Sequence, residues 1–123
     1  MAKILVVDDD ARNLRLAVTV LEQEGHKVLS AEDGAKGIEA ALAHAPDLVL
    51  MDVQMPGMDG VSALRLLRAE PRTAALKVVA LTALTMKGDC ERLLADGFDG
   101  YIEKPIRYKE FLASVAALLA GEQ

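Results

Sequence analysis

Polar residues follow directly after short apolar runs at four places in this sequence. They are Asp8-Asp9-Asp10 after residues 4–7, Asp52 after 48–51, Thr82 after 78–81, and Lys104 close after 100–102. Several carboxylates in one cleft cannot all stay ionised unless a proton or a cation compensates their charge. Ligands that are all oxygen favour a hard ion such as Mg²⁺. An ammonium and a hydroxyl nearby suit a tetrahedral anion, so the set predicts a nucleophilic carboxylate beside a metal, with two donors for phosphoryl oxygens.

These residues can meet only if the apolar runs before them form one sheet. The runs 4–7, 48–51 and 78–81 are continuously apolar, which is typical of strands covered on both faces. The more polar segments 27–31 and 100–102 are interpreted as edge strands. Apolar residues at helical spacing fill the gaps between strands. The helical stripes are Leu14, Val18 and Leu21 before Gly25; Ile38, Leu42 and Ala45 before Pro46; Val61, Leu64 and Leu67 before Pro71; Met86, Cys90, Leu93 and Leu94 before Gly97; and Phe111, Val115 and Leu118.

This alternation predicts an α/β fold of the (βα)5 type, doubly wound about a five-stranded parallel sheet and flavodoxin-like in topology. With the polar strands at the edges, the sheet order is 2-1-3-4-5. Ligands in such sheets bind at the carboxyl ends of the strands that flank the reversal of direction, here the first and third. We therefore expect Asp8, Asp9 and Asp52 to lie beside each other, with Thr82 and Lys104 approaching from the other side.

Length and composition limit the remaining possibilities. The chain has 123 residues and a formal net charge of −5, which fits one domain over residues 1–123 and argues against direct binding of nucleic acid. No segment approaches the roughly 20 apolar residues that cross a bilayer, so no membrane insertion is expected. The acidic start and the single Cys90 favour the cytoplasm. Met1-Ala2-Lys3 and Gly121-Glu122-Gln123 look like natural ends, and we expect a stand-alone protein rather than a domain cut from a larger one.

Each polar residue also has an ordinary structural interpretation. Asp10 is expected to cap a helix N-terminus rather than to bind metal. Asp8 and Asp9 could simply be negative charge near that terminus, and Asp52 a loop acid. The threonine and the lysine could serve only the backbone and the solvent. The coincidence of five such residues at one edge of the sheet favours a site over these separate explanations.

The sequence resembles the CheY-like receiver domain of two-component response regulators over essentially its full length. The matching stretches are Ile4-Leu5-Val6-Val7-Asp8-Asp9, the run from Asp47 to Gly60, Val79-Ala80-Leu81-Thr82-Ala83, and Gly100-Tyr101-Ile102-Glu103-Lys104-Pro105. Within that family, Met86-Lys87-Gly88-Asp89 is most similar to DivK-type single-domain regulators and to receivers fused to hybrid kinases.

The resemblance implies a role for each matched residue. The implied set comprises Asp52 as phospho-acceptor; Asp8, Asp9, Asp52 and the backbone carbonyl of Gln54 as Mg²⁺ ligands; Thr82 and Lys104 as contacts to the phosphoryl group; Tyr101 as an aromatic switch that follows Thr82 inward; and Pro105 after an expected cis peptide bond. No member of this set is missing from the sequence.

The resemblance also implies the activity. The chain would draw its phosphoryl group from a histidine kinase or a histidine phosphotransfer protein, and would form and lose its own acyl phosphate without being a multiple-turnover enzyme. The added charge would bias the face of the fourth helix, fifth strand and fifth helix toward a downstream target protein. Gln54 and Leu84 would flank the path of the attacking water, and we predict that the apolar Leu84 shields the acyl phosphate and prolongs its lifetime.

Two other functions match part of the same sequence pattern. A metal-dependent phosphatase of the haloacid dehalogenase type would use the Asp-x-Asp of residues 8–10, but it requires Thr or Val where this chain has Arg12. It also requires a longer chain for its later acidic motif. A flavin-binding module would need a loop rich in Ser, Thr and Gly after the first strand. The triply acidic loop here would instead repel phosphate unless a metal intervened.

Overall fold

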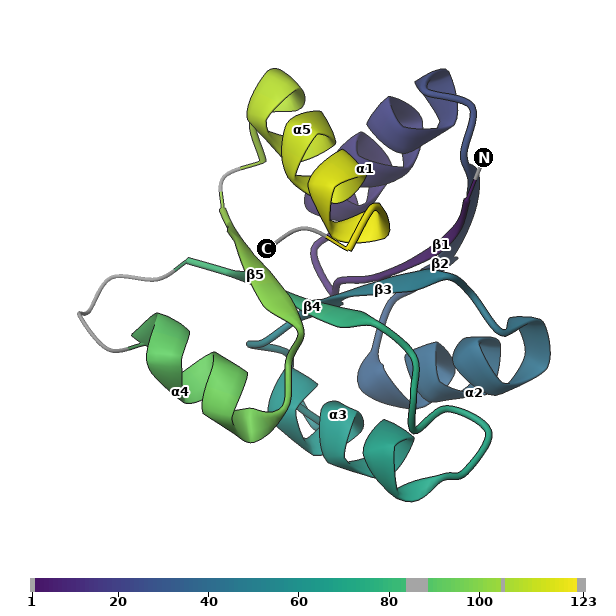
Figure 1. The fold of residues 1–123 in the computed structure, drawn as a ribbon, viewed down its shortest axis with the longest axis vertical. Helices are drawn as coiled ribbons and strands as arrows, with labels where there is room; N and C mark the ends of the chain where they lie inside the picture. Colours follow the sequence, from purple (N-terminus) through teal and green to yellow (C-terminus); the bar gives the residue numbers. More distant parts are fainter. Residues whose placement is uncertain (1, 84–88, 105, 122–123) are drawn as a thin grey trace.

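Strands and helices alternate along the whole described part of the chain, as the sequence predicts. The structure is a computed structural model that describes residues 2–83, 89–104 and 106–121 (Figure 1). The elements are β1 (Lys3–Val7), α1 (Ala11–Gln23), β2 (Lys27–Ala31), α2 (Gly34–His44), β3 (Leu48–Asp52), α3 (Gly60–Ala69), β4 (Val78–Thr82), α4 (Asp89–Asp96), β5 (Gly100–Glu103) and α5 (Tyr108–Leu119).

The strands form one parallel sheet in the order β2-β1-β3-β4-β5, which confirms the predicted topology. β3 and β4 are buried along their whole length, whereas the edge strands β2 and β5 are partly exposed. Val7 pairs with Met51, and Asp52 pairs with Leu81. The three central strands therefore end at the same edge of the sheet, and the residues after them are brought together.

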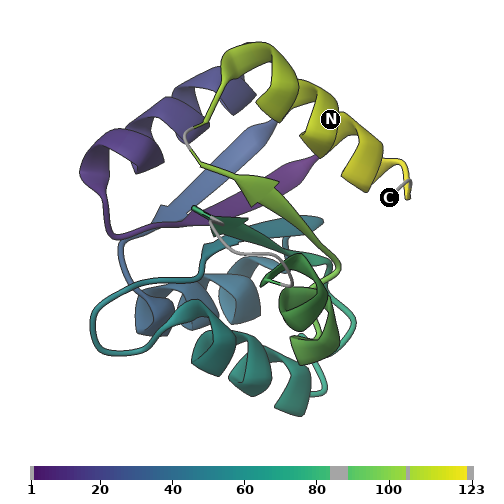
Figure 2. The same cartoon turned by 90° about the vertical axis from the view of Figure 1, so that its left-hand side faces the viewer.

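The helices cover both faces of the sheet. α1 and α5 lie on one face, and α2, α3 and α4 lie on the other (Figures 1 and 2). Successive residues of β1 enter opposite cores: Ile4 and Val6 pack under α1 and α5, whereas Leu5 and Val7 pack toward the other helices. This alternation explains why the strand is apolar at every position. No helix within the described residues is long and apolar enough to cross a membrane.

Aspartates begin the first three helices. Asp10, Asp33 and Asp59 each accept backbone N–H groups of the first helical turn through a side-chain oxygen. Asp10 Oδ1 lies 2.9 Å from the Arg12 nitrogen and 3.3 Å from the Asn13 nitrogen, which confirms the predicted cap. Each such cap contributes about 1 kcal/mol to stability. The caps place the starts of α1 and α3 beside the carboxyl ends of β1 and β3.

Gly60 allows α3 to begin directly against the end of β3. A Cβ atom at this position would overlap the backbone carbonyl oxygen of Asp52, so no other residue fits without moving the backbone. The Gly60 N–H donates to the Val53 carbonyl at 2.9 Å and closes the intervening loop. The loop that follows Asp52 is therefore short and anchored at both ends.

Three helical stripes differ from the prediction. In α2 the buried residues are Gly34, Gly37 and Ala41, whereas Ile38 and Leu42 are only partly covered and Ala45 is exposed. In α1 the buried residues are Ala17, Val20 and Leu21, whereas Leu14 and Val18 are only partly covered. The small Ala17 faces inward, which lets the helix approach the sheet closely.

The interpretation of Leu94 as a core residue of the fourth helix is wrong, because its side chain is 47% exposed. Leu93 faces the core instead. The predicted stripe also includes Met86 and the side chain of Cys90, which lie outside the described residues.

Candidate functional site

Asp8 and Asp52 lie side by side at the carboxyl edge of the sheet, as their positions after paired residues of β1 and β3 require. Their side chains are 1% and 5% exposed. The Asp10 N–H donates to Asp8 Oδ1 at 2.9 Å, and the Gln54 N–H donates to Asp52 Oδ1 at 3.1 Å. An amide two residues further along the chain thus fixes one oxygen of each carboxylate and leaves Oδ2 for other partners.

Lys104, which follows β5, bridges the two carboxylates. Its Nζ lies 3.1 Å from Asp8 Oδ2 and 3.1 Å from Asp52 Oδ2. The Lys104 N–H donates to the Thr82 carbonyl at 2.8 Å, which ties the lysine to the end of β4. This hydrogen bond between the ends of two neighbouring strands brings Lys104 and Thr82 to the edge of the sheet where the aspartates lie.

Burial and charge shift the protonation of both bridged groups. Burial raises the pKa of Asp52 from 3.8 to about 6, although the hydrogen bond and charge of Lys104 oppose this rise and the charge of Asp8 adds to it. Burial alone would lower the pKa of Lys104, but the hydrogen bonds and charges of Asp52 and Asp8 outweigh burial and raise it. Lys104 is therefore an ammonium. Asp52 is mainly a carboxylate at neutral pH, although its burial makes the charged form less stable than it would be in water.

The acidic cluster fits a hard divalent cation. Asp8, Asp9 and Asp52 each offer a carboxylate oxygen, and these oxygens all lie within 4.8 Å of one another. Asp8 Oδ2 is buried, and its close partner among the described residues is the Lys104 ammonium, 3.1 Å away, which it shares with Asp52 Oδ2. Buried anionic oxygens that share a single ammonium, in a set of ligands that are all oxygen, suit Mg²⁺ better than a softer metal.

These side chains open into a pocket of about 210 Å³. The residues that line it are Asp9, Asp10, Asn13, Asp52, Gln54, Thr82, Ala83 and Lys104. The pocket is thus built from the segments after β1, β3, β4 and β5. It contains or adjoins every predicted ligand and phosphoryl contact that the structure describes.

Asn13 is the residue of this pocket that sequence reasoning missed. It lies on the first turn of α1, three residues after the Asp10 cap. A polar residue on the first helical turn after an acidic strand end is a sequence signal that could have predicted its place in the pocket. Two other predicted features, the cis peptide before Pro105 and the shield at Leu84, fall on residues outside the described part of the chain.

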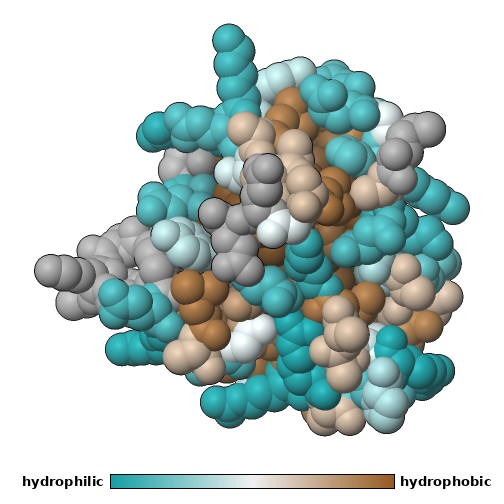
Figure 3. Space-filling view, viewed as in Figure 1, coloured by the Kyte–Doolittle hydropathy of each residue, from teal (hydrophilic) through white to brown (hydrophobic). Residues whose placement is uncertain are grey.

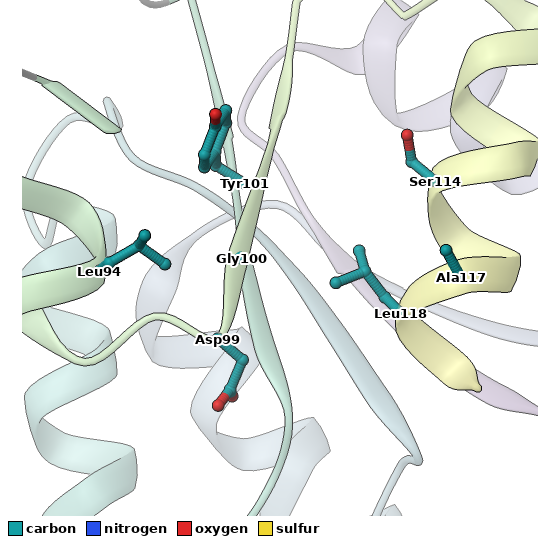
Figure 4. Close-up of a pocket in the computed structure, with 7 residues that line it drawn as sticks. All are labelled: Leu94, Asp99, Gly100, Tyr101, Ser114, Ala117 and Leu118. Atoms are coloured by element: carbon teal, nitrogen blue, oxygen red, sulfur yellow. The ribbon is translucent and has the colours of Figure 1, made fainter. Parts of the chain in front are cut away.

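Tyr101, the predicted switch residue, lies outside the carboxylate pocket. It lines a separate pocket of about 390 Å³ over β5, between α4 and α5. Figure 4 shows Leu94 of α4 on one side of the strand and Leu118 of α5 on the other, with Gly100 between them. Figure 3 shows hydrophobic side chains exposed between polar ones on the side of the molecule that carries these elements. The Tyr101 pocket is therefore separate from the carboxylate pocket and shares no lining residue with it.

Known proteins resemble this chain in both sequence and structure. The sequence profile of the response regulator receiver domain matches residues 4–116. The sensor protein GacS of Pseudomonas syringae pv. syringae is 43% identical over 122 residues, which make up 97% of this chain but only 13% of GacS. The polar-differentiation response regulator DivK of Brucella anthropi is 32% identical over 116 residues, 94% of each protein. Among solved structures, the receiver domain of sensor histidine kinase PA1611 from Pseudomonas aeruginosa superposes with a TM-score of 0.85 at 31% identity, and the alignment covers 98% of each chain. That structure holds a magnesium ion coordinated in its active site cleft.

Proposed function

This chain belongs to the response regulator receiver family, and we propose that it accepts a phosphoryl group on Asp52 from a histidine kinase or a histidine phosphotransfer protein. The observation that supports this most is the place of Asp52. It is a buried carboxylate at the end of a central strand, 3.1 Å from the Lys104 ammonium and in one pocket with Thr82. Receiver domains are signalling phospho-acceptors, so each chain carries one group rather than turning over a substrate.

The transfer is an in-line displacement at phosphorus. An oxygen of Asp52 forms a bond to phosphorus while the bond from phosphorus to the donor's histidine nitrogen breaks, and the electron pair of that bond leaves with the imidazole. The Lys104 ammonium and the Thr82 hydroxyl donate hydrogen bonds to the non-bridging oxygens. The carboxylate needs no general base, because it is ionised at neutral pH when its charge is compensated.

Asp8, Asp9 and Asp52, together with the backbone carbonyl of Gln54, would hold Mg²⁺ in this pocket. When bound, the ion supplies positive charge that stabilises the oxygens of the transferred group. The Asp10 carboxylate takes no part, since it is engaged with the first turn of α1.

The acquired charge acts on the face formed by α4, β5 and α5. Phosphorylation adds up to two negative charges and new acceptor oxygens next to Lys104 and Thr82. Because the Lys104 N–H is bonded to the Thr82 carbonyl, a movement of either residue is felt in β5, the strand that carries Tyr101. A shift of Tyr101 changes the surface between α4 and α5, and a downstream target protein reads that change.

The assignment is tested by mass spectrometry of the intact protein after incubation with acetyl phosphate and Mg²⁺. The parent should gain one phosphoryl group, and EDTA should prevent this. Asp52→Asn should gain none while keeping the parental circular dichroism. Asp59→Asn is the matched control, because Asp59 follows the same strand but caps α3 outside the pocket. Undiminished labelling of Asp52→Asn would refute the assignment, and repeated turnover of a phosphate ester would favour the phosphatase instead.

A further inference from the structure

One wall of the carboxylate pocket is acidic except at a single residue. The segment after β1 contributes Asp9, Asp10 and Asn13 to the lining, whereas Thr82 and Lys104 line it from the ends of β4 and β5. A carboxylate only accepts hydrogen bonds, but a carboxamide also carries two N–H donors. Asn13 is therefore the donor side chain on the α1 wall, among the described residues that line it.

The Asn13 side chain is not engaged in holding α1 together. Its backbone N–H is capped by Asp10 at 3.3 Å, but its carboxamide makes no hydrogen bond with residues 2–83, 89–104 or 106–121. Asparagine is also a poorer helix former than alanine at a position inside a helix. A residue that weakens the helix slightly and has no protein partner is available to a ligand.

The charge of the pocket makes such a neutral donor valuable. The carboxylates of Asp8, Asp9, Asp10 and Asp52 stand against the one ammonium of Lys104 within the described site. The Mg²⁺ that the proposed function requires would offset two of these charges, but four carboxylates against one ammonium and one divalent ion still leave a net charge of −1, which repels an anionic phosphoryl donor. An N–H group on the α1 wall attracts the anion, and a hydrogen bond to a charged group is stronger than one between neutral groups.

We propose that Asn13 is a substrate-binding residue whose carboxamide N–H donates to an oxygen of the incoming phosphodonor and orients its phosphorus toward Asp52. The inference rests on the proposed function and adds a donor-recognition role on α1. With acetyl phosphate, the bond from phosphorus to the acetyl oxygen breaks as the bond to Asp52 forms, and acetate leaves with the electron pair. Asn13 holds the anion on the side where carboxylates would otherwise repel it.

The test is the rate constant for phosphorylation by acetyl phosphate at saturating Mg²⁺. Asn13→Ala should be about tenfold slower, which corresponds to the loss of about 1.4 kcal/mol of binding. Asn13→Asp should be slower still, because it replaces the N–H donors with negative charge, and Asn13→Gln should recover part of the rate. Gln23→Ala is the matched control: it removes an exposed carboxamide from the other end of α1, and its rate should equal that of the parent.

Two further measurements separate donor binding from a structural role. The Mg²⁺ dissociation constant of Asn13→Ala, measured by calorimetry, should stay within about twofold of the parent, and its urea midpoint should be equal or higher because alanine favours the helix. The rate defect should appear chiefly in KM for acetyl phosphate. The proposal is overturned if Asn13→Ala is phosphorylated at the parental rate, or if its Mg²⁺ affinity falls as far as its rate. Failure of the proposed function would differ, because then the parent itself would carry no phosphoryl group on Asp52.

Discussion

Replacing Asp52 with asparagine should stabilise the folded protein at neutral pH when Mg²⁺ is chelated. The Asp52 side chain is only 5% exposed. Burial raises its pKa from 3.8 to about 6, although Lys104 opposes the rise. The carboxylate that predominates at neutral pH is therefore less favourable in the folded state than in the unfolded chain.

The raised pKa fixes the sign and size of the pH dependence. The stabilising effect of the protonated Asp52 is fully present below about pH 3.8 and is lost as the pH rises through about 6. The difference between the two pKa values corresponds to about 3 kcal/mol at neutral pH. Asparagine has the shape of the uncharged carboxyl and still accepts the Gln54 N–H through its oxygen. We therefore expect the variant to gain about 1 to 3 kcal/mol at about pH 7.5 and almost nothing at about pH 4.

Urea unfolding followed by far-UV circular dichroism in EDTA measures this difference at both pH values. The expected gain corresponds to a rise in Tm of roughly 3 to 12 °C for a domain of this size. Asp59→Ala is a control of opposite sign. Asp59 accepts the Ser62 N–H at 2.8 Å, and this bond lowers its pKa, so its contribution of about 1 kcal/mol is lost as the pH falls. If Asp52→Asn is no more stable than the parent at pH 7.5, the burial argument is wrong.

Asp9→Ala should weaken Mg²⁺ binding more than Asp10→Ala, because Asp10 is engaged in the α1 cap; equal dissociation constants by calorimetry would contradict this. Lys104→Met should slow phosphorylation by acetyl phosphate about 10- to 100-fold, because it removes a donor to the phosphoryl oxygens. It should nevertheless strengthen Mg²⁺ binding, because the lost ammonium lies 3.1 Å from two carboxylates of the cluster. Weaker Mg²⁺ binding would count against the charge argument. Arg68→Met should lower the free energy of unfolding by about 2 kcal/mol, because this guanidinium donates to four acceptors in the segments before β4 and β5. Arg72→Met should change the free energy of unfolding by less than about 0.5 kcal/mol, since among the described residues Arg72 pairs only with the nearby, exposed Glu70. Equal losses for the two variants in urea titrations would refute the role of Arg68.

The fold was predictable because its central strands must be apolar on both faces. Ile4 and Val6 enter one core and Leu5 and Val7 enter the other, so a continuous apolar run has no other stable place in an α/β sheet. The sheet order followed from the polarity of the two edge strands. Once the order is fixed, the register places Asp52 beside the residues after β1 without further information.

Details that depend on how a helix is rotated were not predictable. The sequence places Leu93 and Leu94 in one apolar stripe, but only one of two consecutive residues can point at the sheet, and packing decides which. The same reasoning applies to Asn13, which the sequence marks only as polar. Its access to the pocket depends on where the Asp10 cap starts α1. Nor could the sequence show that Lys104 bridges Asp8 and Asp52, because the reach of a lysine side chain is set by the packing around it.

The burial that destabilises the Asp52 carboxylate also connects it to the face formed by α4, β5 and α5. Because Asp52 is shielded from water, a change in its charge is felt strongly by Lys104, whose Nζ lies 3.1 Å away. Lys104 directly follows β5, and its N–H is bonded to the carbonyl of Thr82 at the end of β4. A change in the charge of Asp52 therefore acts on the ends of β4 and β5 together. β5 is an edge strand only four residues long, and it carries Tyr101 between α4 and α5. Of these two strands, β5 can therefore shift with less disturbance of the core than the fully buried β4.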